Sequence, residues 1–254
     1  MRSYILQLEY RDSGTKQERL SRAADIIRSL ENPDIILLPE LWATGFFSYG
    51  DYEKNSEAAD GETFALLSKL AREKDTYIFT GSFTEKSGGR LYNTALLLDR
   101  SGEIAAAYRK IHLFGDEKKL VSPGTDIVTA ETELGVIGMS ICYDLRFPEL
   151  YRRLSEKGAE LFLSCYALPA ERLEHWRILT PARALENQAF FLSCGCSGKN
   201  NGVLFSGHSM IVTPRGEILR EGGIHEKIIC ADIDPEAARR YRESFPALKD
   251  RVLF

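Results

Sequence analysis

Long apolar runs are missing from this chain of 254 residues. The longest ones, residues 35–39 and 190–193, are far too short to span a bilayer. The first residues, MRSYILQ, show neither the apolar core nor the cleavage site of a secretion signal. We therefore expect no membrane-spanning segment, no membrane partner and a cytoplasmic location.

An excess of charge of one sign is also missing. The chain carries 33 basic and 37 acidic side chains, which gives a formal net charge of −4 at pH 7. Proteins that bind nucleic acid usually show a basic patch or stripe, and no such stripe with interleaved aromatic residues occurs here. The charge balance therefore predicts that the partner is a small molecule and not nucleic acid.

Cysteine pairs with a recognisable spacing are absent as well. The five cysteines are odd in number and match neither a disulfide framework nor a CxxC redox motif, which favours a reducing compartment. The four histidines are scattered, so spacing gives no support for a metal site. The glycine-rich stretches match neither a phosphate-binding loop nor a dinucleotide fingerprint. We therefore expect no metal and no cofactor.

What the sequence does contain is an alternation of helix and strand patterns. Apolar residues at helical spacing, or buried and alternating apolar runs, define the individual elements. Strands are expected over residues 3–9, 35–38, 77–83, 90–99, 104–110, 135–143, 161–165, 189–194, 209–213 and 227–232. Helices are expected over residues 15–30, 63–74, 147–157, 175–187 and 235–243.

This order of elements predicts the fold class. Helices alternating with strands, together with a hairpin around residues 100–102, favour an α/β layered sandwich with mixed sheets. The strands over 209–213 and 227–232 are expected to bracket a turn at 213–216. No linker or internal repeat interrupts the chain, so residues 1–254 are interpreted as one domain. The polar, irregular segment 46–61 is expected to be a loop over a site.

Three reactive side chains share one position in this pattern: each follows an apolar strand. Glu40 follows residues 35–39, Lys110 follows 104–109, and Cys142 follows 136–141. In open α/β sheets, ligands bind beyond the carboxyl ends of the strands. Three groups far apart in sequence are therefore candidates to converge on one site.

Each of these residues also has a simpler interpretation. Cys142 is expected at a strand-to-helix junction, where a helix N-terminus and a nearby cation lower a thiol pKa; the alternative is an inert buried cysteine. Glu40 in an apolar pocket would act as a general base, and Lys110 would stabilise an oxyanion; the alternatives are solvated surface charges. A cysteine–histidine dyad with His112 or His175 is a further alternative, but no accompanying signature supports it.

Taken together, these residues resemble the nitrilase, or carbon–nitrogen hydrolase, superfamily. LLPE at 37–40 with TGF at 44–46 resembles the motif of the catalytic glutamate, and YRKIHL at 108–113 resembles that of the catalytic lysine. ICYDLRFPE at 141–149 is similar to the nucleophile motif. RALEN at 183–187 and GHSMIVTPRG at 207–216 resemble two supporting stretches. The five pieces occur in family order over nearly the whole chain.

This resemblance implies a four-layer α-β-β-α sandwich that forms a homodimer or a higher homo-oligomer and needs no cofactor. It also implies a catalytic triad in which Glu40 is the base, Lys110 stabilises the oxyanion and Cys142 is the nucleophile. A second glutamate follows the lysine in many members, and Glu117 matches it best. The implied reaction releases ammonia from an amide through a thioester on Cys142.

The residues after the nucleophile are similar to those of the omega-amidase group, which acts on amides of α-keto acids such as α-ketoglutaramate. Such substrates carry a carboxylate, for which Arg146 is a candidate ligand; a structural ion pair is its alternative. Tyr143, Trp42 and Tyr166 are candidates to line the pocket, whereas packing is favoured for Phe46 and Trp176. Other functions left open are an N-carbamoyl amine or deaminated-glutathione amidase, and a catalytically silent scaffold.

Overall fold

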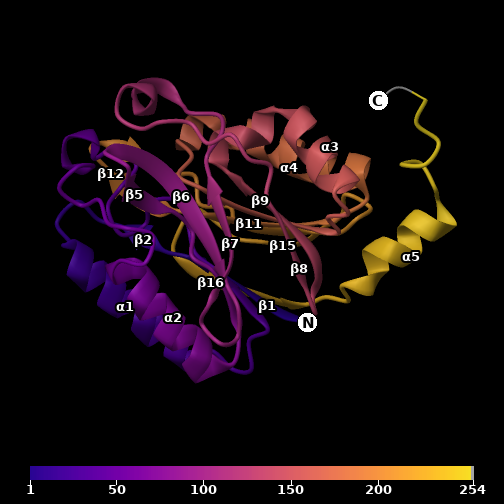
Figure 1. Ribbon diagram of the computed structural model, residues 1–254, viewed down its shortest axis with the longest axis horizontal. Helices are drawn as coiled ribbons and strands as arrows, with labels where there is room; N and C mark the ends of the chain where they lie inside the picture. The colour runs from indigo at the N-terminus through magenta and orange to yellow at the C-terminus, as the bar shows by residue number, and fades with distance from the viewer. Residues whose placement is uncertain (253–254) are drawn as a thin grey trace.

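Two β-sheets packed face to face, with helices on both outer faces, form the molecule (Figure 1). This computed structural model describes residues 1–252. Helices α1 (Lys16–Ser29) and α2 (Glu62–Lys74) cover one sheet, and α3 (Pro148–Glu156) and α4 (Leu173–Asn187) cover the other. The order of layers is α-β-β-α, so the predicted four-layer sandwich with mixed sheets is confirmed.

The first sheet has seven strands in the order β16-β1-β3-β4-β6-β5, with β7 paired to the other edge of β6. Strands β1, β3 and β4 run parallel, and α1 and α2 connect them. The bounds are β1 Arg2–Gln7, β3 Ile35–Leu37, β4 Tyr77–Phe79, β5 Phe83–Ser87, β6 Arg90–Leu98, β7 Ile104–Arg109 and β16 Lys227–Asp232.

The second sheet has six strands in the order β15-β14-β11-β10-β9-β8, and β9, β10 and β11 run parallel. Its bounds are β8 Thr129–Thr132, β9 Gly135–Ile141, β10 Leu161–Tyr166, β11 Phe190–Gly195, β14 Met210–Val212 and β15 Ile218–Glu221. A small third sheet joins β2 (Glu9–Tyr10), β12 (Ser197–Asn200) and β13 (Val203–Leu204).

Three apolar cores separate the four layers. Alternate residues of one strand face different cores, because side chains on a strand point to opposite faces. In β3, Ile36 packs under α1 and α2, whereas Ile35 and Leu37 face the second sheet. In β10, Leu163 faces the first sheet and Phe162 packs under α3 and α4. Strands buried on both faces explain the continuous apolar runs in the sequence.

Helix α1 shows why the predicted elements form where they do. Thr15 caps its N-terminus: the Thr15 side chain accepts from the Glu18 N–H, and Glu18 accepts from the Thr15 N–H. This reciprocal arrangement satisfies two backbone donors that the first turn leaves free. Leu20, Ala23 and Ile27 lie at helical spacing and are buried against the first sheet.

Two strand predictions were wrong in detail. The run 77–83 is not one strand, because it breaks at Gly81, which has a φ of +67°. The late strand over 209–213 forms its hairpin with β15, which was not predicted, around the turn at 213–217. Strand β16 instead crosses to the first sheet and pairs antiparallel with β1. Strands β8, β12 and β13 were not predicted either, since they are short and lack long apolar patterns.

The last helix, α5 (Glu236–Ser244), extends from the side of the sandwich (Figure 1). The Arg242 guanidinium attaches it to the body by donating to the backbone carbonyls of Ala159 and Asn187. Among residues 1–252, no helix is both long and apolar enough to cross a bilayer.

Candidate active site

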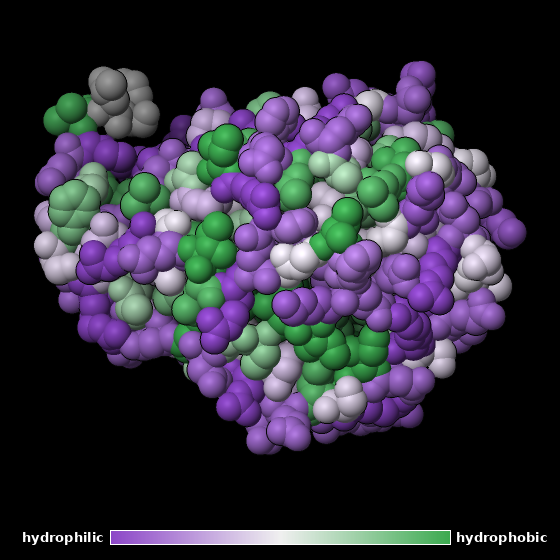
Figure 2. All heavy atoms as spheres, turned by 180° about the vertical axis from the view of Figure 1, so that it is seen from behind, coloured by the Kyte–Doolittle hydropathy of each residue, from purple (hydrophilic) through white to green (hydrophobic). Residues whose placement is uncertain are grey.

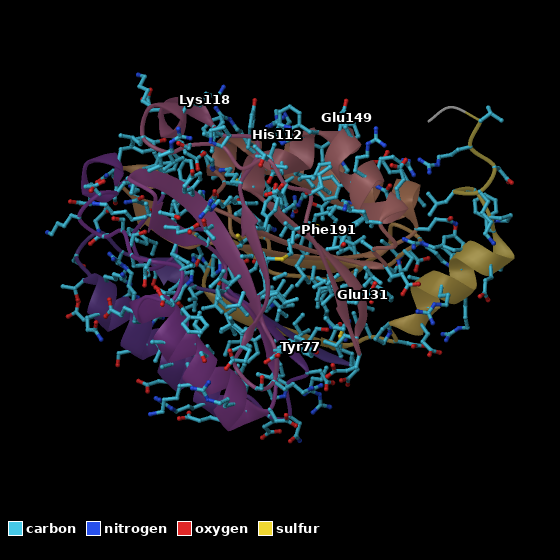
Figure 3. All side chains as sticks on the ribbon, in the orientation of Figure 1. Tyr77, His112, Lys118, Glu131, Glu149 and Phe191 are labelled. Carbon is cyan, nitrogen blue, oxygen red and sulfur yellow. The ribbon has the colours of Figure 1, made fainter. Side chains whose placement is uncertain are left out.

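Glu40, Lys110 and Cys142 meet at one end of the sandwich. Lys110 follows β7 directly and Cys142 follows β9 directly, while Glu40 lies three residues beyond β3. In Figure 3 the labelled residue His112, two residues after Lys110, lies at this end. The labelled residue Tyr77, at the start of β4, lies at the opposite end. The first sheet therefore supplies the acid and the ammonium, and the second sheet supplies the thiol.

The backbone around Glu40 is fixed by the break at Gly81. A Cβ on Gly81 would lie 2.0 Å from the carbonyl oxygen of Pro39, so only glycine permits this close approach. The two segments also pair: the Ser82 N–H donates to the Pro39 carbonyl, and the Leu41 N–H donates to the Ser82 carbonyl. The same glycine that divides the predicted strand thus positions the catalytic candidate Glu40.

Lys110 lies between two carboxylates in a fully buried cluster. Its Nζ donates to Oε1 of Glu40 at 2.7 Å and to Oε2 of Glu117 at 2.9 Å, and all three side chains have no exposed area. Buried charges are tolerated when they are paired and hydrogen-bonded. The ring of Phe46, the first residue of the segment 46–61, lies over the ammonium, with its centroid 5.1 Å from Nζ.

Asn93 is a site residue that sequence reasoning missed. Its Nδ2 donates to Oε1 of Glu40 at 2.9 Å and to Oε1 of Glu117 at 2.8 Å, so one amide bridges both acids. The pairing of β6 with β7 sets this position, since the Lys110 N–H donates to the Asn93 carbonyl. A single asparagine in an expected hairpin strand carries no local signal of such a role.

Burial and mutual charge set the protonation of this cluster. Burial alone would lower the pKa of Lys110, but the charges of Glu117 and Glu40 outweigh it and raise that pKa well above its usual value. Burial, helped by the charge of Glu117, raises the pKa of Glu40 despite the opposing effect of Lys110. Lys110 therefore stays an ammonium, and Glu40 is a stronger base than an ordinary glutamate.

Cys142 begins a short 3-10 turn, Cys142–Arg146, with a φ of +48°. This left-handed conformation is uncommon for residues other than glycine and marks local strain. The expected lowering of the thiol pKa does not occur: burial and the charge of Glu40 raise the pKa of Cys142 well above its usual value, against the effect of Lys110. The resting group is thus a thiol, which needs a base to remove its proton.

A pocket opens on the Cys142 side chain. Its charged and polar lining comes from Arg146, Arg172 and His175, with no acidic side chain among the described lining residues. The remaining walls are Phe114, Tyr143, Leu145, Leu168, Pro169, Trp176 and Leu179. Tyr143 and Arg146, two of the candidates for substrate binding, are among these lining residues. Arg172 was not considered from the sequence, because it lies in a 3-10 turn ahead of the expected helix start.

Trp42 and Tyr166 do not line this pocket, so these two pocket assignments need correction. Trp42 is buried in the core between the helices and the first sheet, and its Nε1 donates to the Thr80 carbonyl at 3.0 Å. Tyr166 is fully buried, and its hydroxyl donates to the Gly207 carbonyl at 2.7 Å. Trp176, expected only to pack, packs against Tyr166 and also forms part of the pocket wall.

The two histidines of the dyad alternative face other groups. His112 Nδ1 lies 2.8 Å from the Asp144 carboxylate, and its ring stacks on Phe147. His175 lies in the pocket wall with its Nδ1 3.0 Å from Arg146. The charged groups that act on the pKa of the Cys142 thiol are Glu40 and Lys110, and neither histidine is among them. Within residues 1–252, no three metal-ligating side chains are grouped to hold an ion.

Comparison with known proteins identifies the family of this chain. Residues 5–243 match the sequence model of the carbon–nitrogen hydrolase family. The chain therefore belongs to that family, and it is an enzyme that hydrolyses carbon–nitrogen bonds.

Individual relatives show which members of the family this chain resembles. The chain is 38% identical to a 2-oxoglutaramate amidase of Paenarthrobacter nicotinovorans over 97% of this chain and 87% of that protein. It is 32% identical to omega-amidase NIT2 of Mus musculus over 97% of this chain and 93% of that one. The structure of Saccharomyces cerevisiae Nit3, a nitrilase-superfamily member of branch 10, matches with a TM-score of 0.90 and 30% identity, over 100% of this chain and 97% of that chain. The predicted kinship with the omega-amidase group is confirmed.

Proposed function

We propose that this enzyme releases ammonia from the side-chain amide of a small α-keto acid such as 2-oxoglutaramate. The observation that carries the proposal is the pair of arginines, Arg146 and Arg172, in the lining of the Cys142 pocket, where the described lining residues include no acid. Such a pocket suits a substrate with a carboxylate next to its reacting amide. Two relatives are named for activities of this kind.

Acylation starts from the thiol form of Cys142. Its Sγ attacks the amide carbon while Glu40 takes the thiol proton, which the raised pKa of that carboxylate favours. The carbonyl oxygen becomes an oxyanion. The Lys110 ammonium and the Tyr143 backbone N–H are the groups proposed to stabilise it.

Collapse of this intermediate breaks the carbon–nitrogen bond. Glu40 returns its proton to the leaving nitrogen, ammonia departs, and the acyl group remains as a thioester on Cys142. Water then attacks the thioester carbon, Glu40 takes one of its protons, and the second tetrahedral intermediate expels the thiolate, which regains the proton. The products are ammonia and the free dicarboxylic keto acid.

Glu117 is proposed as the fourth catalytic residue, beside Glu40, Lys110 and Cys142. It contacts the Lys110 ammonium at 2.9 Å and shares the Asn93 amide with Glu40, and its Oε2 also accepts from the Phe114 N–H. These contacts hold the ammonium beside Glu40 and the thiol. The charge of Glu117 also raises the pKa of Glu40, which makes Glu40 the better base.

Ammonia release from 2-oxoglutaramate tests the proposal, with glutamine, a neutral aliphatic amide, a nitrile, an N-carbamoyl amine and deaminated glutathione assayed in parallel. Release from the keto amide alone, lost in Cys142→Ala, is the expected result. Ammonia release only from an N-carbamoyl amine, or cleavage only of deaminated glutathione, whose amide nitrogen leaves as a peptide amine and not as ammonia, would keep the nucleophile and replace the substrate. No release from any of these compounds would revive the silent-scaffold alternative.

We further propose a homodimer that forms through α4 and β15. Ile178 and Leu185 are seven residues apart on α4 and are 66% and 50% exposed. Ile218 on β15 is also exposed, and an Arg177–Glu221 ion pair links the two elements. Figure 2 shows hydrophobic residues in several groups on the face of the molecule that is seen from behind. Apolar patches of this kind typically mark interfaces.

Light scattering during gel filtration tests this interface. Ile178→Asp is expected to yield a monomer, whereas Ile104→Asp, at an exposed residue of β7, serves as the matched control and is expected to stay dimeric. A monomeric native protein would contradict the proposal.

A cytoplasmic location is proposed on the chemistry of the cysteines. All five are free thiols, three of them buried, and the nucleophile must stay reduced to work. Cell fractionation with an antibody to the chain tests this location; recovery in an oxidising compartment would contradict it.

A further inference from the structure

Asp144 is a fully buried carboxylate that the mechanism does not use. It lies in the 3-10 turn that Cys142 begins, two residues after the nucleophile. Both of its oxygens are engaged. Oδ2 accepts from the Tyr108 hydroxyl at 2.7 Å and from the Ile141 N–H at 2.9 Å. Oδ1 accepts from the His112 N–H at 3.0 Å and lies 2.8 Å from His112 Nδ1.

These partners come from two segments and flank two reactive groups. Tyr108 and His112 stand two residues before and two residues after Lys110, on the first sheet. Ile141 directly precedes Cys142, on the second sheet. One carboxylate therefore ties the end of β7 to the end of β9 at the point where the two sheets supply their reactive groups.

Three of the four contacts donate to Asp144: the Tyr108 hydroxyl and the N–H groups of Ile141 and His112. A carboxylate has about four lone-pair sites, so the four contacts together occupy them. Burial beside Asp144 raises the pKa of Tyr108 well above its usual value, so the phenol stays protonated and donates. Bonds to an ionised acceptor are stronger than neutral ones. They offset the strain of the left-handed Cys142 backbone, which needs support from its surroundings.

We propose that Asp144 is a positioning residue that fixes the distance between the Lys110 ammonium and the Cys142 thiol. It acts through Tyr108 and His112 on the lysine segment and through the Ile141 N–H on the nucleophile turn. This inference rests on the proposed roles of Lys110 and Cys142.

Asparagine at this position is the most informative replacement. It keeps the shape of Asp144 but presents one oxygen and one amino group. If the amide oxygen faces the Ile141 N–H, the amino group faces the His112 N–H. If the oxygen faces the His112 N–H, the amino group faces the Ile141 N–H. Either way two donors oppose each other, and one of the two segments must move. A misplacement of about 1 Å in an active site costs about 100-fold in rate.

The experiment compares Asp144→Asn with wild type and with Leu20→Ala. Leu20 lies on the buried face of α1, far along the chain from the site, so its truncation lowers stability without touching the contacts of Asp144. Three quantities are measured: kcat and KM for the keto amide, thermal stability, and the rate of Cys142 alkylation by iodoacetamide against pH. Peptide mass spectrometry separates Cys142 from Cys230, which is also partly exposed.

The expected result for Asp144→Asn is a fall in kcat of about 100-fold with KM nearly unchanged, and alkylation of Cys142 that requires higher pH. Higher pH is expected because an ammonium farther from the thiol lowers its pKa less. Leu20→Ala should lose stability but keep kcat and the alkylation profile. Wild-type kcat and alkylation in Asp144→Asn would overturn the proposal, as would changes no larger than those of Leu20→Ala.

Tyr108→Phe keeps the test valid if Asp144→Asn does not fold. It removes one donor to Asp144 and leaves both backbone contacts, so a smaller loss of kcat in the same direction is expected. If both variants fold, the double variant should lose little more kcat than Asp144→Asn alone, because both substitutions act through one network. A wild-type alkylation profile in Tyr108→Phe, when Asp144→Asn is insoluble, would overturn the inference.

Failure of this inference differs from failure of the proposed function. If Cys142→Ala stays active, or if Cys142 of the wild type resists alkylation, the proposed function fails. If the wild type behaves as proposed while Asp144→Asn behaves like it, only the positioning role fails.

Discussion

Two groups of charged side chains flank the Cys142 thiol, and they are held in different ways. Behind the thiol, Glu40, Lys110 and Glu117 have no exposed side-chain area and bond to one another at 2.7 and 2.9 Å. In the pocket mouth, Arg146 and Arg172 are partly exposed. Each mouth arginine has few partners: Arg146 lies 3.0 Å from His175, and Arg172 lies over the Phe114 ring and 3.8 Å from the exposed Glu171 carboxylate.

The difference separates chemistry from recognition. Buried ion pairs are expensive to desolvate, and breaking one by removing a partner typically costs about 3–5 kcal/mol. Such a cluster has one geometry, which suits proton transfer over short distances. Partly exposed guanidinium groups keep rotational freedom and can close on a carboxylate when it arrives. We therefore expect substitutions behind the thiol to affect kcat and those in the mouth to affect KM.

The largest effect is expected from Cys142→Ala. Removal of a nucleophile costs several orders of magnitude in kcat, and we expect a loss of about 10⁴-fold or more. The left-handed backbone strains alanine as much as cysteine, so thermal stability should change little. Steady-state ammonia release and a thermal melt measure the two effects.

Cys194→Ala is the matched control for that variant. Cys194 is fully buried between the sheets, and its Sγ lies 3.3 Å and 3.4 Å from the carbonyl oxygens of Leu6 and Leu37, to one of which its single S–H donates. It should lose stability, by about 1 kcal/mol for the lost contacts, and retain activity. The reverse pattern in the two variants would remove Cys142 from the mechanism.

The second effect concerns the mouth. Arg146→Gln should raise KM for the keto amide by about 10- to 100-fold, because a hydrogen bond to a charged group contributes about 1.5–3 kcal/mol. Its kcat should change little, since the arginine binds ground state and transition state alike. Arg172→Gln should act in the same direction. Kinetics with a neutral aliphatic amide provide the control. An equal rise in KM for that amide would show that neither arginine binds the substrate carboxylate.

The same contrast explains how much of the site the sequence predicts. Glu40, Lys110 and Cys142 stand at strand ends, and strand ends are visible as the limits of apolar runs. The sequence does not predict the role of Asn93, because this role depends on the register between β6 and β7. That register brings the Asn93 carbonyl to the Lys110 N–H. Arg172 depends on a turn whose path no periodicity defines.

The fold shows the same limit. Helices and long strands follow from burial patterns, and their observed bounds differ from the predicted ones by a few residues. The pairing of β16 with β1 connects opposite ends of the chain. Strand pairing over such a separation is decided by packing of the whole sheet, so the local pattern at 227–232 predicts a strand but not its partner.

The charge effect of Glu117 on the pKa of Glu40 in the buried cluster can be tested by the pH dependence of kcat/KM. Glu40 must be ionised to accept the thiol proton, so the acid limb of kcat/KM follows its titration. Burial, helped by the charge of Glu117, raises the pKa of Glu40, so this limb should lie above the range of an ordinary glutamate. Glu117→Gln removes the neighbouring negative charge, which lowers the pKa of Glu40 and should move the limb to lower pH.

The pH dependence of kcat/KM in both proteins measures this shift. Arg146→Gln, which leaves the buried cluster intact, is the control and should keep the wild-type limb. A limb that moves to higher pH in Glu117→Gln would show that the lost support of Lys110 outweighs the lost repulsion. That outcome would contradict the charge effect assigned to Glu117.

The smallest effect on catalysis is expected at Trp42. The sequence places this aromatic residue beside Glu40, whereas the structure buries it in the core with its Nε1 bonded to the Thr80 carbonyl. Trp42→Phe removes that donor and leaves a small void, so a loss of about 1–3 kcal/mol in the free energy of unfolding is expected. Both kcat and KM should remain near wild type, because the residue does not line the pocket. Denaturant unfolding and steady-state kinetics on the same preparation decide the matter. A raised KM with unchanged stability would return Trp42 to the substrate pocket, since a core residue affects stability first.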